Sequence, residues 1–86
     1  SWRCMPSIEK IFSILNLLLE HHRTGLTNKE ISKALKIPPS TCYRILAGLR
    51  KVDLVHQRRM DMRYVLGFAY LRFADAVLEG TNTAEI

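Results

Sequence analysis

The stretch that decides the fold is LKIPPSTCYRILAGLRK, which runs from Leu35 to Lys51. Its two adjacent prolines predict a turn, and Pro39 fits the first position of a helix, where no backbone N–H is needed. After the turn, apolar residues recur at spacings of three and four, as in a helix with one buried face. These residues are Cys42, Ile45, Leu46, Leu49 and Val52. The stretch therefore predicts a turn followed by a two-faced helix over residues 39–52.

The opposite face of this helix carries hydroxyls, an aromatic ring and cations. It comprises Ser40, Thr41, Tyr43, Arg44, Ala47, Gly48 and Lys51. Hydroxyls and N–H groups at a helix start can hold phosphate oxygens, and Arg44, one turn further, can reach a base edge or a phosphate. We expect Ser40 or Thr41 to cap the helix and at least one of them to meet a phosphate. Tyr43 fits either a sugar–phosphate contact or the edge of the core.

A shorter helix is predicted before the turn, over residues 28–35. Thr27 and Glu30 have the spacing of a capping box at its start. Lys36 follows its end, where the chain turns left-handed, and this costs a residue other than glycine about 1 kcal/mol. Two short helices, a tight turn and a two-faced helix together predict a helix-turn-helix.

The first predicted helix runs from residue 8 to residue 22 and is apolar on two sides. One face contains Ile8, Ile11, Phe12, Leu15, Leu18, Leu19 and His22. Ile14 and Leu17 lie on another face, and a helix with a second apolar patch usually buries that patch against something else. We therefore expect Ile14 and Leu17 to contact a second subunit.

A hairpin, or wing, is predicted after the two-faced helix. Alternating residues predict strands over 54–58 and 63–66, joined by a tip at 59–62. Three arginines lie at or near this tip: Arg58, Arg59 and Arg63. An arginine at a wing tip can enter a minor groove, whereas the alternative is a hairpin whose edge charges only keep it soluble. We favour DNA contact, because these cations belong to the same basic part of the chain as the two-faced helix.

The last predicted helix begins at Gly67 and is apolar nearly all round. Its large apolar residues include Phe68, Leu71, Phe73 and Val77. Such a short helix must be covered on more than one side. The domain core can cover one side, and the remainder predicts either a dimer interface or packing against another domain.

The cations of the chain are concentrated before Gly67. The 86 residues carry a net charge of +5, and residues 1–66 hold 12 Lys and Arg against 5 Asp and Glu. Residues 67–86 hold one Arg against 3 acidic residues. A basic part followed by an acidic tail is expected of a nucleic-acid surface, although a soluble domain can also be basic by chance. The length fits one domain with a small core, a size that often gains stability by association.

The sequence offers little support for other functions. Cys4 and Cys42 lie far apart, so we expect no disulfide framework and interpret Cys42 as a core residue. The three histidines lack the spacing of a metal site. No carboxylate pair, nucleophile–base arrangement or glycine-rich phosphate loop is present, so we expect neither an enzyme nor a cofactor. No signal peptide or membrane span is recognisable, so we expect a cytoplasmic protein.

The order of these motifs resembles the N-terminal DNA-binding domain of the IclR-family bacterial transcriptional regulators. The two most specific blocks are Ile37–Leu46 and Tyr64–Gly67, and the resemblance covers residues 7–80. It implies a winged helix-turn-helix that dimerises through its first and last helices and binds a near-palindromic operator. It also implies a C-terminal effector-binding domain outside these residues, through which a small molecule would act. The DNA-contacting positions that it carries over are Ser40, Thr41, Tyr43 and Arg44, with the wing arginines alongside.

These observations predict a mainly α fold with a small β-hairpin. The expected segments are an N-terminal arm at 1–6, a winged helix-turn-helix at 7–66, a linker and dimerisation helix at 67–79, and the start of a linker at 80–86. The expected DNA contacts are Ser40, Thr41, Tyr43, Arg44, Lys51, Arg58, Arg59 and Arg63. The expected dimer contacts are Ile14, Leu17, Phe68, Leu71, Phe73 and Val77.

The leading interpretation is a homodimer that reads an operator, with helix 39–52 in the major groove and the wing near the minor groove. The alternative is a winged helix that contacts another protein while its basic face is merely solvated. That alternative would require apolar residues on the outer face of helix 39–52, where the sequence has mainly hydroxyls and cations.

Overall fold

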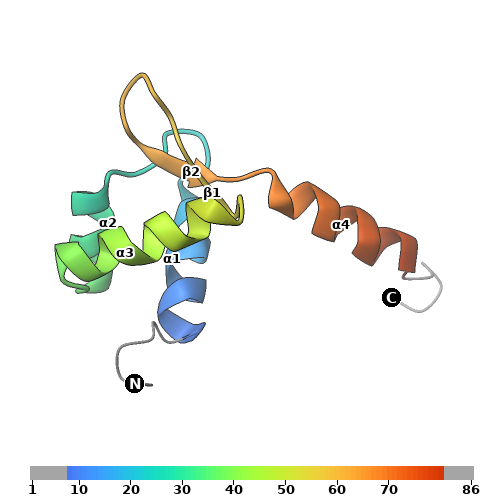
Figure 1. The fold of residues 1–86 in the computed structure, drawn as a ribbon, viewed down its shortest axis with the longest axis horizontal. Coiled ribbons are helices and arrows are strands. Elements are labelled where there is room, and N and C mark those ends of the chain that lie inside the picture. The colour runs from blue at the N-terminus through green and yellow to red at the C-terminus, as the bar shows by residue number, and fades with distance from the viewer. Residues whose placement is uncertain (1–7, 81–86) are drawn as a thin grey trace.

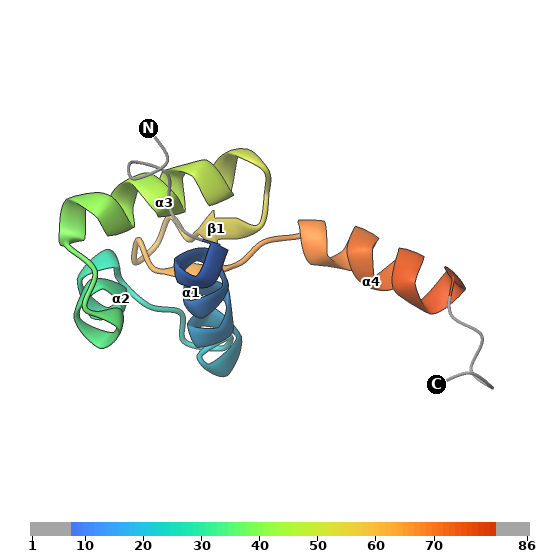
Figure 2. The same cartoon turned by 90° about the horizontal axis from the view of Figure 1, so that it is seen from below.

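A computed structural model describes residues 8–80 as helices, strands and their connections. The elements are α1 (Ile8–Glu20), α2 (Asn28–Leu35), α3 (Pro39–Lys51), β1 (Val55–Gln57), β2 (Tyr64–Leu66) and α4 (Ala69–Gly80). The predicted mainly α fold with one hairpin is confirmed. The first three helices and the hairpin form one body, and α4 extends away from it in both views (Figure 1, Figure 2). The predicted arm at 1–6 and the segment 81–86 lie outside the described residues.

The core lies where α1, α2, α3 and the hairpin meet. Its buried members are Ile14, Leu18, Ile31, Ile37, Cys42, Ile45, Leu46, Leu49, Val55 and Tyr64. The predicted apolar face of α3 is therefore confirmed, including Cys42 as a buried core residue. Val52 is the exception, because α3 ends at Lys51 and Val52 follows as its cap, with 56% of its surface exposed.

The buried and exposed residues of α1 do not divide as the two predicted faces do. Of the larger predicted face, Leu18 is buried, and Ile11 and Leu15 pack against the core. Ile14 is fully buried, and Leu17 packs against the core. The large apolar residues left exposed on this helix are Ile8, Phe12 and Leu19. The full burial of Ile14 contradicts the expectation that it contacts a second subunit, and Leu17, which is partly buried, packs mainly against the core of its own chain. The reason is that α1 is apolar around most of its circumference, and its packing against α2 and β2, not the number of apolar residues, determines which side is buried.

The turn between α2 and α3 has the predicted local geometry. The capping box is confirmed, because Glu30 N–H donates to Thr27 Oγ1 at 3.1 Å and Thr27 N–H donates to Glu30 Oε1 at 2.8 Å. Lys36 ends α2 in the left-handed region, with φ 56°. Ser32, buried on α2, donates its hydroxyl to the carbonyl of Ile37 and so fixes the turn from inside.

The hairpin is shorter than predicted and is joined to the rest of the body at both ends. Its strands pair antiparallel with Gln57 opposite Tyr64. Tyr64 also exchanges two backbone hydrogen bonds with Leu26, at 2.7 and 3.0 Å, which attaches β2 to the loop before α2. After β2, a Cβ atom on Gly67 would lie 2.2 Å from the carbonyl oxygen of Asp53. Only glycine fits there, so the point at which α4 leaves the body is fixed by a close backbone contact.

Candidate nucleic-acid interface

α3 lies at the surface of the body (Figure 2). Its outer face carries the predicted polar residues. Ser40, Arg44 and Lys51 are exposed, and Thr41 is half-buried. Tyr43 has 56% of its surface exposed, so more than half of its ring is available to a partner. The single helix α3 therefore displays hydroxyls at its first turn, a cation one turn later and another at its end.

α3 begins at Pro39 as predicted, but its capping differs from the prediction. No side chain caps this helix, whose N-cap residue is Pro38, so the expected cap from Ser40 or Thr41 is wrong. The reason is that a proline occupies the capping position and another follows at the first helical position, where the prolines themselves fix the backbone. The Thr41 hydroxyl instead accepts a long hydrogen bond from Arg44 Nη2 at 3.4 Å.

Arg58, near the hairpin tip, is held by the chain itself. Its guanidinium binds the carboxylate of Asp61 at 2.8 Å and donates to the backbone carbonyls of Arg23 and Thr24. This arginine therefore fastens the hairpin to the loop between α1 and α2. Sequence reasoning did not find this role, because two of the three partners lie 34 and 35 residues away along the chain.

Arg63, on the other side of the tip just before β2, also anchors the hairpin to the rest of the body. Its Nη1 lies 3.0 Å from Glu30 Oε1 and 3.1 Å from the carbonyl oxygen of Gly25. Glu30 thus serves both the capping box of α2 and the attachment of the hairpin. Arg59, the third arginine at the tip, is exposed. Its side chain forms no hydrogen bond or ion pair with residues 8–80.

The carboxylates of Asp61 and Glu30 form ion pairs with Arg58 and Arg63. A hydrogen bond from the Arg58 guanidinium, followed by one from the Arg63 backbone N–H, lowers the pKa of Asp61 below its ordinary value. The hydrogen bond from the Thr27 backbone is the largest cause that lowers the pKa of Glu30, and the charge of Arg63 adds to it. Both acids therefore stay ionised beside the arginines at neutral pH.

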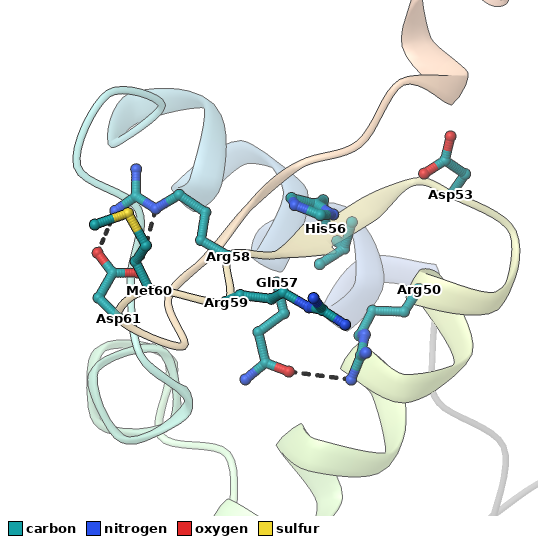
Figure 3. A pocket seen from close by; sticks show the side chains of 9 residues that line it. Arg50, Asp53, His56, Gln57, Arg58, Arg59, Met60 and Asp61 are labelled. Carbon is teal, nitrogen blue, oxygen red and sulfur yellow. Dashed lines mark hydrogen bonds and ion pairs between the residues drawn. The ribbon is translucent and has the colours of Figure 1, made fainter.

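An open hollow lies between the last turn of α3 and the hairpin (Figure 3). Arg50, Gln57 and Arg59 are among the residues that line it, and Figure 3 shows the Arg50 and Arg59 side chains directed into it. Gln57 Oε1 accepts a hydrogen bond from Arg50 Nη1 at 3.1 Å. Sequence reasoning named neither Arg50 nor Gln57, because the contact between them exists only once the hairpin folds back on α3.

A separate apolar surface lies along α4. Ala69 and Tyr70 hold the start of this helix, since Ala69 is buried and Tyr70 half-buried. The rest of α4 is exposed, and its large apolar residues are Leu71, Phe73, Val77 and Leu78, preceded by Phe68. The exposed Ile8, Phe12 and Leu19 form a second apolar surface on α1. Monomeric soluble proteins rarely expose apolar surface on this scale.

Two other kinds of site were sought in the described part of the chain. Residues 8–80 contain no group of His, Cys, Asp and Glu side chains that could hold a metal ion. Within the same residues, every helix is too short or too polar to span a bilayer.

The comparisons with known proteins agree on one family. Residues 7–59 match the family described as the IclR helix-turn-helix domain. The crystal structure of an IclR transcriptional regulator from Alicyclobacillus acidocaldarius is similar over 91% of this chain, with a TM-score of 0.82 and 27% sequence identity. HmgR from Pseudomonas aeruginosa shares the fold over 90% of the chain, with a TM-score of 0.68 and 24% identity. This chain spans 31% of the length of each of these two structures. No curated protein matches it.

The matched family segment covers α1, α2, α3 and β1, which is more than half of the chain and includes the whole helix-turn-helix. The agreement extends from the local motifs to the three-dimensional fold, because the similarity to the Alicyclobacillus structure covers 91% of the chain, more than the family segment does. The chain therefore belongs to the IclR family and is a helix-turn-helix DNA-binding domain of a transcriptional regulator, not an enzyme.

Proposed function

We propose that this domain binds a near-palindromic operator as a homodimer, with α3 in the major groove and the hairpin tip at the adjacent minor groove. The observation that carries the proposal is the outer face of α3, which presents hydroxyls and cations on a rigid helix packed by its other face into the core. A helix of this kind fits the width of the major groove. The proposed place of action is the bacterial cytoplasm, where the DNA lies.

The first turn of α3 is assigned to the phosphate backbone. Ser40 and Thr41 offer hydroxyls and, because no side chain caps the helix, the backbone N–H groups beside them remain open to a phosphate oxygen. Lys51 at the other end of α3 adds a second phosphate contact. Such contacts set the register of the domain on the duplex without reading sequence.

Base reading is assigned to Arg44, with Tyr43 beside it. Arg44 is exposed one turn into α3 and carries only a long intramolecular hydrogen bond at 3.4 Å, which DNA can replace. A guanidinium can bind the O6 and N7 acceptors of guanine together, which distinguishes one base pair from the others. Tyr43 supplies an exposed ring for a sugar or phosphate contact.

In the wing, we assign the three arginines to two different roles. Arg59 is the contact residue of the proposal, because its side chain is exposed and has no hydrogen bond or ion pair within residues 8–80. Arg58 and Arg63 hold the hairpin against the α1–α2 loop and α2. Their contribution to DNA binding is therefore mainly to hold Arg59 in place.

The proposed dimer uses the exposed apolar surfaces of α4 and α1. On α4 the expected contacts are Leu71, Phe73 and Val77, together with Phe68 just before the helix. On α1, Ile8, Phe12 and Leu19 replace the pair that sequence reasoning had selected. A symmetric dimer presents two α3 helices, and this accounts for the expected two-fold symmetry of the operator. We further propose that a small-molecule effector acts through another domain, since this chain corresponds to 31% of the solved regulators.

The test is a selection of this chain against a pool of random duplexes at about physiological salt, followed by a salt titration on the enriched sequence. The proposal predicts a two-fold symmetric site with half-sites about one helical turn apart or a little further. Weak, steeply salt-dependent binding to all sequences, without enrichment, would contradict sequence-specific binding by this domain.

A further inference from the structure

One side chain connects the hairpin tip to the last turn of α3. Gln57 ends β1, and its Oε1 accepts a hydrogen bond from Arg50 Nη1 at 3.1 Å. Its Nε2 donates to the backbone carbonyl of Met62 at 3.0 Å. In Figure 3 the Gln57 amide extends from the strand toward the Arg50 guanidinium. The Gln57 amide therefore accepts a hydrogen bond from α3 through its oxygen and donates one to the hairpin tip through its nitrogen.

Other bonds fix the tip from within: Asp61 accepts from the Arg58 guanidinium and from the Arg63 backbone N–H, and Arg58 N–H donates to the Arg63 carbonyl. None of these bonds reaches α3. The strands are only three residues long. Met62 adopts the left-handed region, with φ 61°, which is unfavourable for a residue other than glycine. Within the tip, Met62 N–H donates to the Arg58 carbonyl at 2.8 Å. The bond from Gln57 to the Met62 carbonyl supports this strained residue from the side of α3.

We propose that Gln57 is a positioning residue for DNA binding, which sets the hairpin tip and with it Arg59 at a fixed place relative to α3. The inference rests on the DNA-binding mode proposed above. A tip that is ordered before binding does not have to be ordered during binding, and the complex gains the corresponding free energy. The contribution of Gln57 is thus indirect and passes through Arg59.

The bonds to Arg50 and Met62 require a side chain whose end carries both a hydrogen-bond acceptor and a hydrogen-bond donor. A primary amide has both. Gln57→Met keeps the approximate length and loses both hydrogen bonds. Gln57→Glu keeps an acceptor for Arg50 and loses the donor to Met62. The two variants therefore separate the bond to α3 from the bond to the tip.

The first measurement is the affinity of the 86-residue chain for the duplex enriched by the selection, measured by fluorescence anisotropy. We expect Gln57→Met to weaken binding about three- to ten-fold, the effect of losing one or two exposed hydrogen bonds. In an Arg59→Ala background the same change should have almost no further effect, because the tip then has no contact left to position. In an Arg44→Ala background, where the lost contact lies on α3, the full effect should remain.

An equal loss in all three backgrounds would overturn the proposal, because it would mean that Gln57 acts through general stability. An unchanged affinity in Gln57→Met would overturn it as well. If the unsubstituted chain fails to bind any selected duplex, the proposed function itself fails, and this result is distinct from the other two.

A second measurement needs no DNA. Amide hydrogen exchange at Met62 should accelerate in both Gln57→Met and Gln57→Glu, because both lose the donor to the tip. Exchange at the buried residue Leu46 should stay the same and shows that the fold is intact. Unchanged exchange at Met62 in both variants would overturn the positioning role even in a chain that binds DNA.

Discussion

At the residue scale, Arg44 is the side chain on which sequence reading depends in the proposed complex. We expect Arg44→Ala to cost about 1–3 kcal/mol of specific binding and to relax base preference at one position in each half-site. The measurement is affinity for the selected duplex and for duplexes substituted at each position. Arg72→Ala is the matched control, because Arg72 is also exposed but lies on α4. An equal loss on selected and random DNA would assign Arg44 to a phosphate instead.

Gly48 is a residue that the fold itself does not require. It lies exposed within α3, four residues after Arg44, and a Cβ atom added there would meet nothing within 4 Å. A glycine inside a helix costs about 1 kcal/mol relative to alanine. We expect Gly48→Ala to raise the free energy of unfolding by roughly 0.5–1 kcal/mol in urea denaturation. If α3 enters a groove, the same methyl group should weaken binding to the selected duplex.

Gly67 provides the contrasting case for the same experiment. A Cβ there would lie 2.2 Å from the Asp53 carbonyl oxygen, so the backbone itself must shift. Gly67→Ala should lower the free energy of unfolding by about 1–3 kcal/mol, the range of a forced backbone change. If both substitutions changed the free energy of unfolding in the same direction, the surroundings of the two glycines would differ less than the structure indicates.

At the scale of elements, the attachment of the hairpin depends on two ionised acids. Hydrogen bonds and nearby arginines lower the pKa values of Glu30 and Asp61 in the folded chain from ordinary values of 4.5 and 3.8. A lowered pKa in the folded state adds stability that is fully present above the ordinary value and is lost as the pH falls through the folded value.

Stability measured by thermal unfolding should therefore decrease as the pH is lowered below the ordinary values of 4.5 for Glu30 and 3.8 for Asp61. The double variant Glu30→Gln, Asp61→Asn should be less stable at neutral pH and show a weaker dependence on pH in this range. Glu20→Gln combined with Glu79→Gln, at exposed positions near the ends of α1 and α4, is the control with the same change in charge. An unaltered pH profile in the double variant would show that these acids do not hold the hairpin.

The elements differ in how far the sequence determines them. The boundaries of α2 and the start of α3 were predicted because their signals are local: the Thr27–Glu30 capping box and Pro39 act within a single turn. The buried face of α1 was predicted only in part: Leu18 lies on the larger predicted face, but Ile14 was assigned to a second subunit and is buried in the core. Apolar residues surround most of this helix, so only its packing selects the buried side. The fastening of Arg58 and Arg63 was missed since most of their partners, such as Glu30 for Arg63, are distant in the sequence.

The candidate site likewise has one part that the sequence predicts and another that it does not. The outer face of α3 follows from helical periodicity alone, because once one face is buried the opposite face must be exposed. The bridge from Arg50 through Gln57 to the hairpin tip has no signal in the sequence, because it joins two elements whose relative placement is set by the core. The local sequence pattern thus predicts which residues face outward. Tertiary packing decides which of them already form hydrogen bonds or ion pairs within the chain.

At the scale of the whole molecule, α4 is the element that the described chain leaves without a partner. Its exposed large apolar residues fall into two sets at helical spacing: Leu71 and Leu78 on one side, to which Phe68 just before the helix adds, and Phe73 and Val77 on another. One side suits a second copy of the chain, and the other suits either that copy or a further domain. Since α4 makes few contacts beyond its first turn, a change there can affect association without disturbing the core.

We therefore expect Leu71→Asp or Phe73→Asp to weaken the dimer while the monomer stays folded. Leu71 and Phe73 have 64% and 55% of their surfaces exposed, so a carboxylate there costs little in the monomer but is buried in a dimer interface. Sedimentation equilibrium measures the monomer–dimer constant, and circular dichroism checks the fold. Met60→Asp adds the same charge at a residue that is 99% exposed in the hairpin tip, and it should leave association unchanged. A monomer–dimer constant that is the same in all of these variants would place the dimer contact elsewhere than α4.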